Sequence, residues 1–317
     1  MAEQQSWHEF WAGGEGDEAV GGVQRHRLAA RWAQFFLGPR PARPRPLVID
    51  IAAGRGVALR AAIEALDGTA DFLAVDYSPA AAASARRGLG SAFAAAADAA
   101  RLPLTDHCAA YVISQYGIEY AGGGAFAEAA RILAPGGRFC AVAHFRGGAI
   151  DAECAENERL LLAAAGPALF DAARRALAES FARRAGGAAE RADASLENAF
   201  SAAMTAALAA LRPAPPSAAR STLERFLADL SRLSARRLAY EDSDALGWVS
   251  GMEASLGAYL KRMQSMRGAA LDAGGIADIA GHFAAAGLGD FSATPLHLDG
   301  GRPPAAWVIE ARRPDTV

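Results

Sequence analysis

Lysine is almost missing from this 317-residue chain, because Lys261 is the only lysine among 32 basic residues. The net charge is -3. Without a basic excess the chain lacks the electrostatic attraction to phosphates on which nucleic-acid binding depends. Arginine in place of lysine, together with abundant alanine, is typical of a bacterial genome rich in G and C. We therefore expect a bacterial protein without a nucleic-acid partner.

Cysteine and long apolar runs are scarce as well. The three cysteines, Cys108, Cys140 and Cys154, do not form CxxC pairs, which argues against a zinc site and for a reducing compartment. No run of 18 apolar residues is free of charge, and residues 1–5 are acidic and polar, unlike a signal peptide. These absences predict a cytoplasmic, metal-independent protein without a membrane span.

The most informative stretch that is present lies at residues 47–56. An apolar run ends in Asp50, Gly54 and Gly56 follow, and residues 57–63 have the pattern of a helix. A strand, a glycine turn and a helix start bring backbone N–H groups close to a bound ligand. A second apolar run ends in Asp76, about 20 residues past the turn, where an acid can accept hydrogen bonds from ribose hydroxyls.

Strand and helix patterns alternate through residues 47–147, which favours an α/β fold with a doubly wound, mostly parallel sheet. The expected strands are 47–51, 71–76, 92–95, 109–114 and 137–144, and after a helix at 274–287 they are 289–297 and 305–311. Residues 150–272 contain no strand pattern and read as four or five helices. The predicted domains are an N-terminal helical segment (1–46), a core (47–149), a helical insertion (150–272) and a completion of the core (273–317).

Residues 50–56, Asp-Ile-Ala-Ala-Gly-Arg-Gly, resemble the first turn of class I S-adenosylmethionine (SAM)-dependent methyltransferases, which is Asp/Glu-x-Gly-x-Gly-x-Gly. Ala52 stands where the family usually has glycine, so a left-handed backbone there would be strained. The resemblance covers roughly residues 47–147 and 274–313. It implies SAM as cofactor, S-adenosylhomocysteine as product, and a seven-stranded Rossmann-like sheet whose last strand is antiparallel.

The resemblance also implies a set of cofactor-binding residues at the ends of successive strands. These are Asp50, Ala52, Gly54, Gly56, Asp76, Tyr77, Asp98, Ala99, Ser114 and Gln115. Asp76 would bind the ribose, Tyr77 would lie along the adenine, and Asp98 and the Ala99 N–H would contact its edge. Ser114 and Gln115 would lie near the methionine part. A capping role in a turn or helix start is the alternative for Asp76 and Asp98.

Candidate catalytic residues follow the fourth and fifth strands. Tyr116 and Glu119 come directly after the fourth strand, where they would face a substrate. His144 ends the fifth strand at the same edge of the sheet. A histidine there is either a general base or a structural residue with its ring nitrogens satisfied.

Together these features predict in-line transfer of a methyl group from SAM to a small-molecule acceptor, such as a metabolite or natural product. The helical insertion is expected to be a lid over that acceptor. Three alternatives stay open: a peptide or protein side chain as acceptor, SAM-dependent chemistry other than methyl transfer, and a non-catalytic scaffold. The sequence also leaves open a homodimer.

Overall fold

The computed structural model describes residue 11 and residues 23–41, 43–66, 68–186, 194–298 and 303–315. Most of the predicted N-terminal segment before residue 23, and residues 299–302 between the last two strands, lie outside the described residues. The chain divides into two compact units. We call residues 1–152 and 265–317 the core unit and residues 153–264 the helical unit.

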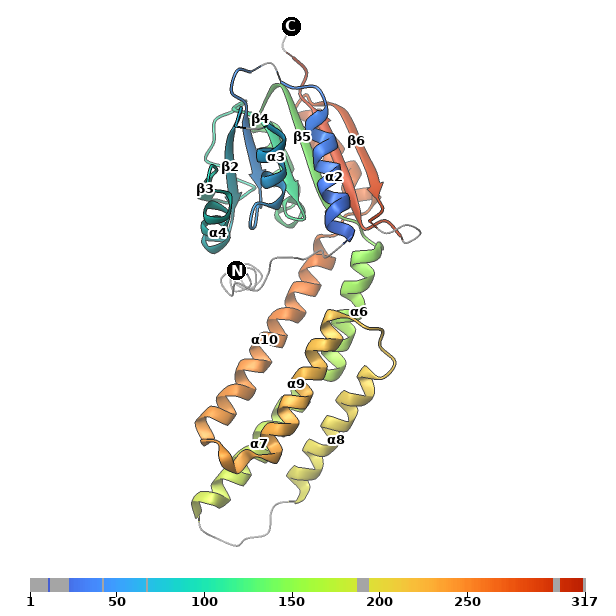
Figure 1. Cartoon of the computed structure of the whole chain (residues 1–317). Coiled ribbons are helices and arrows are strands. Elements are labelled where there is room, and N and C mark those ends of the chain that lie inside the picture. Colours follow the sequence, from blue (N-terminus) through green and yellow to red (C-terminus); the bar gives the residue numbers. More distant parts are fainter. Residues whose placement is uncertain are drawn as a thin grey trace. The chain divides into compact units, whose positions relative to one another are not determined.

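The core unit contains a seven-stranded sheet in the order β3-β2-β1-β4-β5-β7-β6 (Figure 1). The strands are β1 (Leu47–Ile51), β2 (Asp71–Asp76), β3 (Phe93–Ala96), β4 (Ala109–Gln115), β5 (Leu133–His144), β6 (Gly289–Leu296) and β7 (Ala306–Arg312). Strands β1 to β5 pair in parallel, whereas β7 is antiparallel to both of its neighbours. This confirms the predicted sheet and its antiparallel last strand.

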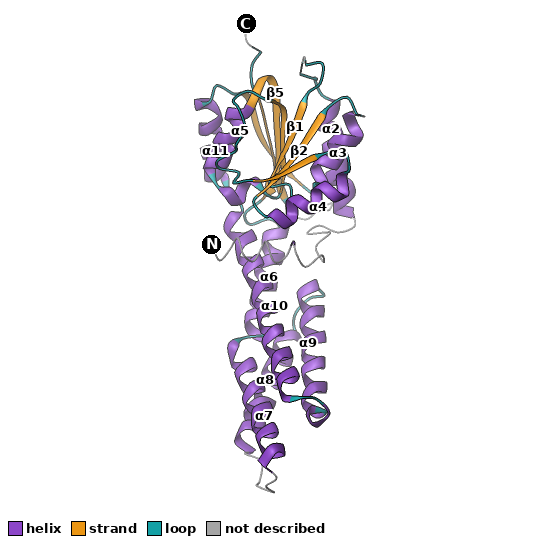
Figure 2. Ribbon diagram, turned by 90° about the vertical axis from the view of Figure 1, so that its left-hand side faces the viewer, coloured by secondary structure: helices purple, strands orange, loops and turns teal. Residues whose placement is uncertain are grey.

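Helices cover both faces of the sheet (Figure 2). One face carries α2 (Val23–Leu37), α3 (Val57–Leu66) and α4 (Pro79–Leu89), and the other carries α5 (Gly123–Ile132) and α11 (Ala273–Ala285). A short 3-10 helix, η1 (Ile118–Ala121), follows β4. Because helices cover both faces, the central strand β4 is buried over all its residues except Gln115, which explains its continuous apolar run.

Strand β5 begins at Leu133, four residues before the start predicted from the sequence, so that boundary was wrong. Gly136 N–H donates to the carbonyl oxygen of Arg313 at 3.0 Å, and Arg313 N–H donates to Gly137 at 3.0 Å. The Pro-Gly-Gly segment therefore pairs with the C-terminal chain and extends the strand, and the left-handed φ of +70° at Gly136 is one that glycine adopts readily.

The remaining elements in the described residues are helices. They are α6 (Ala149–Ala164), α7 (Pro167–Gly186), α8 (Ala194–Leu211), α9 (Ala218–Ala235), the 3-10 helix η2 (Arg237–Ala239) and α10 (Asp242–Ala269). Helices α6 and α10 run from the core unit into the helical unit. None of the helices in the described ranges is long and apolar enough to cross a membrane.

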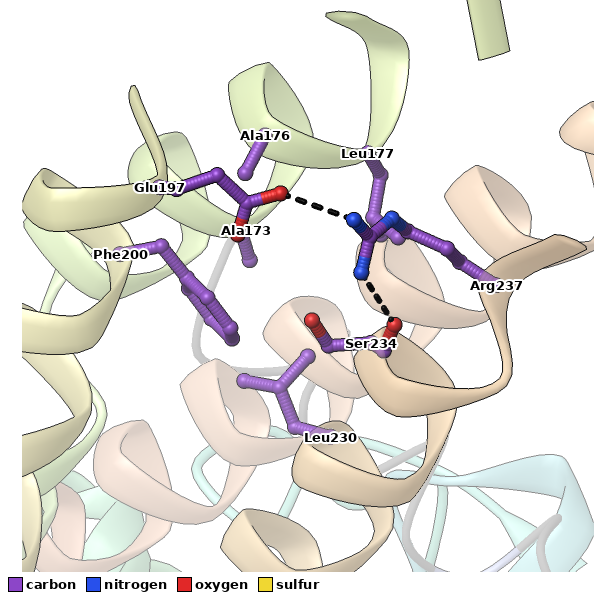
Figure 3. Close-up of a pocket in the computed structure, with 8 residues that line it drawn as sticks. All are labelled: Ala173, Ala176, Leu177, Glu197, Phe200, Leu230, Ser234 and Arg237. Carbon is purple, nitrogen blue, oxygen red and sulfur yellow. Dashed lines mark hydrogen bonds and ion pairs between the residues drawn. The ribbon is translucent and has the colours of Figure 1, made fainter. Parts of the chain in front are cut away.

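Helices α7, α8 and α9 enclose a small hollow between apolar side chains such as Phe200 and Leu230 (Figure 3). The guanidinium of Arg237 lies at its rim and donates to Glu197 at 3.0 Å, to the Ser180 hydroxyl at 2.7 Å and to the Ser234 carbonyl at 2.9 Å. The hollow is too narrow for a water molecule. It is a packing feature that Arg237 closes by joining three segments.

Candidate functional site

Asp76 ends β2 and connects two turns. One carboxylate oxygen accepts a hydrogen bond from Gly54 N–H at 2.8 Å, and the other accepts one from Ser78 N–H at 2.8 Å. Ser78, not Asp76, provides the side-chain cap of α4, by accepting from Ala81 N–H at 3.3 Å. Burial raises the pKa of Asp76, and the two backbone N–H groups oppose that rise. Each carboxylate oxygen retains a lone pair, so the group can also accept two ligand hydroxyls.

The turn after β1 has the left-handed backbone that its sequence requires, with φ of +54° at Ala52, +55° at Gly54 and +75° at Gly56. Side chains occupy the space that a Cβ would need at the two glycines. The Trp11 ring lies 2.8 Å from the Cβ position of Gly54, and the Leu89 side chain occupies the Cβ position of Gly56. The glycines thus make room for packing of the turn as well as for backbone approach to a ligand.

Ala52 lies against Gly117, which follows β4. A Cβ built on Gly117 would be 2.6 Å from the Ala52 carbonyl oxygen and 2.7 Å from its Cβ. The left-handed conformation of an alanine costs about 1–2 kcal/mol. Ala52 is accommodated because Gly117 has no side chain. The sequence did not indicate this role of Gly117, because the two positions are 65 residues apart.

Asp50 is a buried acid inside the first strand, with 1% of its surface exposed. One oxygen accepts from Leu59 N–H, at the beginning of α3, at 3.2 Å. The other oxygen has no hydrogen-bond partner among the residues that the structure describes. Burial raises the pKa of Asp50 well above its ordinary value, and the charge of Asp76 adds to the rise. A nearby cationic ligand would favour its ionised form.

The predicted adenine-binding residues follow two neighbouring strands: Tyr77 follows β2, and Asp98 and Ala99 follow β3. Ala97 N–H donates to the Asp76 carbonyl at 2.9 Å and holds this loop beside the strand end. Asp98 is exposed and accepts from Ala100 N–H at 2.9 Å, as expected for a turn residue with free acceptor sites. Tyr77 is 53% exposed, whereas Ala99 is buried.

Ser114 and Gln115, at the end of β4, already have protein partners. The Ser114 hydroxyl donates to the Ile51 carbonyl at 2.7 Å and accepts from Ile118 N–H at 3.0 Å, so it joins β1 to η1. Gln115 accepts from the Trp32 indole N–H at 2.7 Å. Trp32 is 1% exposed and lies on α2, within the segment that the sequence predicted to be helical. These contacts fix the strand end beside the glycine turn.

The three candidate catalytic residues lie together. Glu119 Oε1 is 2.7 Å from His144 Nδ1, and it also accepts from the His144 backbone N–H at 3.0 Å. The Tyr116 and His144 ring centroids are 4.6 Å apart, and Tyr120 packs edge-on against His144 at 5.8 Å. Strands β4 and β5 are parallel neighbours, so the residues that follow β4 meet the end of β5.

Two polar atoms in this cluster are buried without a hydrogen-bond partner in the described parts of the chain: Glu119 Oε2 and the Tyr116 hydroxyl. Tyr116 also has a φ of +53°, a strained conformation for an aromatic residue, and its N–H is held by the Val142 carbonyl at 2.7 Å. Burial raises the pKa of the Tyr116 phenol, and the charge of Glu119 adds to that rise. The phenol therefore stays protonated and able to donate.

Comparison with known proteins shows what part of this chain resembles. Residues 48–137 match a family model described as a methyltransferase domain. The matched segment includes the glycine turn, Asp76, Asp98 and the residues that follow β4. This segment is similar to a methyltransferase domain, and the sheet to which it belongs has the Rossmann-like arrangement that the sequence resemblance implied. Class I methyltransferases, which the sequence resembles, use SAM as their cofactor.

Two solved structures illustrate the similarity. One is the complex between the Haloferax volcanii Trm112 methyltransferase activator and a protein described as "the putative methyltransferase"; it has 24% identity over 41% of this chain and 63% of its own, with a TM-score of 0.31. The other, geranyl diphosphate C-methyltransferase from Streptomyces coelicolor A3(2), has 16% identity over 46% and 66%, with a TM-score of 0.37. The matched part spans less than two-thirds of each structure. No curated protein matches the chain.

Proposed function

We propose that this protein transfers the methyl group of SAM to a small-molecule acceptor. The observation that carries the proposal is the bond between the Asp76 carboxylate and the Gly54 backbone, within the segment that matches a methyltransferase domain. It brings a buried acid with free acceptor sites to the glycine turn at the carboxyl ends of the strands, where ligands of open α/β sheets bind.

The residues at this edge fit the chemical groups of SAM. Asp76 would accept the ribose hydroxyls, and the exposed Asp98 and Tyr77 would contact the adenine. Asp50, with its partnerless oxygen, can become negatively charged near the turn when a cationic ligand favours its ionised form. When bound, SAM supplies a methyl group that its sulfonium has already activated. The remaining work of the chain is to align the acceptor and exclude water.

A small acceptor fits the burial and charge of the site. Glu119 is 5% exposed and His144 is 4% exposed, so an acceptor must enter a largely enclosed cluster. The chain has no basic excess with which to hold a nucleic acid. The helical unit lies outside the segment that matches the family, and we propose that it provides selectivity for the acceptor as a lid.

Calorimetric titration with SAM and S-adenosylhomocysteine tests the cofactor assignment. We expect the whole chain to bind both, and Asp76→Asn to bind about 10- to 100-fold more weakly, because hydrogen bonds to a charged group contribute about 1.5–3 kcal/mol. Asp71→Asn is the matched control, since Asp71 begins the same strand and its side chain forms an exposed ion pair with Arg45. An Asp76→Asn protein that is folded and binds normally would contradict the ribose assignment.

Detection of S-adenosylhomocysteine tests methyl transfer itself. The purified chain is incubated with SAM and a panel of small hydroxylated, amine and carboxylate compounds, and the product is quantified by mass spectrometry. Release of S-adenosylhomocysteine together with a methylated compound supports the proposal. A different SAM-derived product would indicate another SAM-dependent reaction, and binding without any turnover would favour a non-catalytic scaffold.

The affinity for SAM should increase with pH above the ordinary range of aspartate, about pH 4. Burial raises the pKa of Asp50, so the free protein keeps this proton to a higher pH than an exposed aspartate does. A cationic ligand favours the carboxylate, and binding therefore releases the proton. Titrations in buffers with different heats of ionisation measure that release. Asp50→Asn should reduce the number of protons released on SAM binding. An unchanged release in the variant would show that the ligand does not change the protonation of Asp50.

A further inference from the structure

The hydrogen bonds between Glu119 and His144 define which ring nitrogen of the histidine carries a proton. Glu119 Oε1 lies 2.7 Å from Nδ1 and accepts the backbone N–H of the same residue at 3.0 Å. A carboxylate can only accept hydrogen bonds, so a hydrogen bond between these two atoms requires the proton to be on Nδ1. The other nitrogen, Nε2, then keeps its lone pair and is the basic atom.

We propose that Glu119 is a positioning residue that holds His144 in this tautomer, and that Nε2 removes the proton from a hydroxyl acceptor. This inference rests on the proposed methyl transfer and names the chemical class of its acceptor. Amine or carboxylate acceptors can offer a lone pair without such a base. A buried glutamate and histidine at the strand ends are useful when the reacting atom has a proton to lose.

Two buried polar atoms of this cluster favour an acceptor that carries hydroxyl groups. Glu119 Oε2 and the Tyr116 hydroxyl are buried, and neither has a hydrogen-bond partner among the described residues. Leaving a buried polar group unpaired costs about 1–3 kcal/mol. A ligand that brings a hydrogen-bond donor for the Glu119 oxygen and an acceptor for the Tyr116 phenol would satisfy both groups, and a compound with neighbouring hydroxyls brings both.

The reaction balances with the groups named. The acceptor oxygen forms a bond to the methyl carbon while the bond from that carbon to sulfur breaks and its electron pair remains on sulfur. The hydroxyl proton moves to His144 Nε2 and makes the ring an imidazolium, which the Glu119 carboxylate stabilises through Nδ1. The imidazolium then returns the proton to solvent. The products are a methyl ether and S-adenosylhomocysteine.

Nuclear magnetic resonance of the whole chain, labelled with 15N-histidine and free of cofactor, tests the tautomer. The chain has six histidines, and loss of one set of signals in His144→Asn assigns His144. At pH 8 we expect a protonated Nδ1 and a non-protonated Nε2 for this residue. Glu119→Gln should shift both signals, because an amide can donate as well as accept.

Glu64→Gln removes the same charge from an exposed position on α3 and should leave the His144 signals in place. A His144 ring protonated at Nε2 would overturn the proposal, and so would His144 signals that Glu119→Gln does not move. This measurement uses neither SAM nor an acceptor. A failed SAM titration would therefore remove the proposed methyl transfer, whereas a wrong tautomer would remove only the assignment of the base and its hydroxyl acceptor.

Discussion

Replacing His144 with asparagine should lower the rate of methyl transfer to a hydroxyl acceptor by about 10²- to 10⁴-fold, the usual contribution of a general base. The asparagine side-chain amide lies near the position of Nδ1 and can still donate to Glu119, whereas it has no atom at the position of Nε2. The variant therefore removes the basic nitrogen and preserves the buried hydrogen bond. Its affinity for SAM should not change, since His144 contacts residues of the catalytic cluster and not the glycine turn.

Two measurements separate the effect on the reaction rate from the effect on SAM affinity. The first is turnover of a hydroxyl acceptor, followed by release of S-adenosylhomocysteine, and the second is calorimetric titration with SAM. His282→Asn is a suitable control, because His282 is an exposed histidine of the same unit, on α11. Comparing acceptors of different acidity adds a readout that a structural role would not give: loss of the base should harm weakly acidic hydroxyls most. Normal turnover in a folded His144→Asn protein would show that His144 is structural.

The central strands of the core unit could be predicted because β1, β2 and β4 are apolar runs bounded by turn signals. The starts of β1, β2 and β4 were predicted correctly for this reason, since their residues are buried on both faces of the sheet. The start of β5 was not, because the added segment is a strand through pairing with residues far away in the sequence: Leu133 pairs with Ala109 of β4, and Gly136 bonds to Arg313. Local signals describe a turn there and contain no information about the distant partner.

The same distinction applies to the site. The sequence predicts that Glu119 and His144 lie at the same edge, since both follow adjacent parallel strands. It does not predict that one carboxylate oxygen accepts two hydrogen bonds from a single histidine, because that depends on the 3-10 turn after β4. Two further contacts join segments that are far apart in the sequence: Trp11 lies against Gly54, and Trp32 bonds to Gln115. The local sequence does not predict that these segments come together.

Gly117→Ala should destabilise the core unit by about 1–3 kcal/mol or more, the usual range for overpacking a well-packed site. The new Cβ would meet the Ala52 carbonyl oxygen at 2.6 Å and the Ala52 Cβ at 2.7 Å, and neither a backbone atom nor a Cβ can rotate away. For a unit of this size each kcal/mol corresponds to roughly 2–4 °C in melting temperature. Gly281→Ala is the control, because an open helical position on α11 should gain stability by about 0.5–1 kcal/mol.

The double variant Ala52→Gly/Gly117→Ala should recover only part of the stability lost in Gly117→Ala. Glycine at position 52 removes the contact between the two Cβ atoms and accepts the left-handed φ of +54° without strain, but the carbonyl oxygen at 2.6 Å remains. The four proteins form a double-mutant cycle, and their thermal or denaturant unfolding gives the interaction free energy directly. A coupling of zero would mean that Ala52 and Gly117 do not pack against each other. Partial recovery of stability in the double variant would explain how the chain tolerates alanine at position 52, where the family that it resembles has glycine. The residue that faces Ala52, Gly117, has no Cβ and leaves room for the alanine side chain.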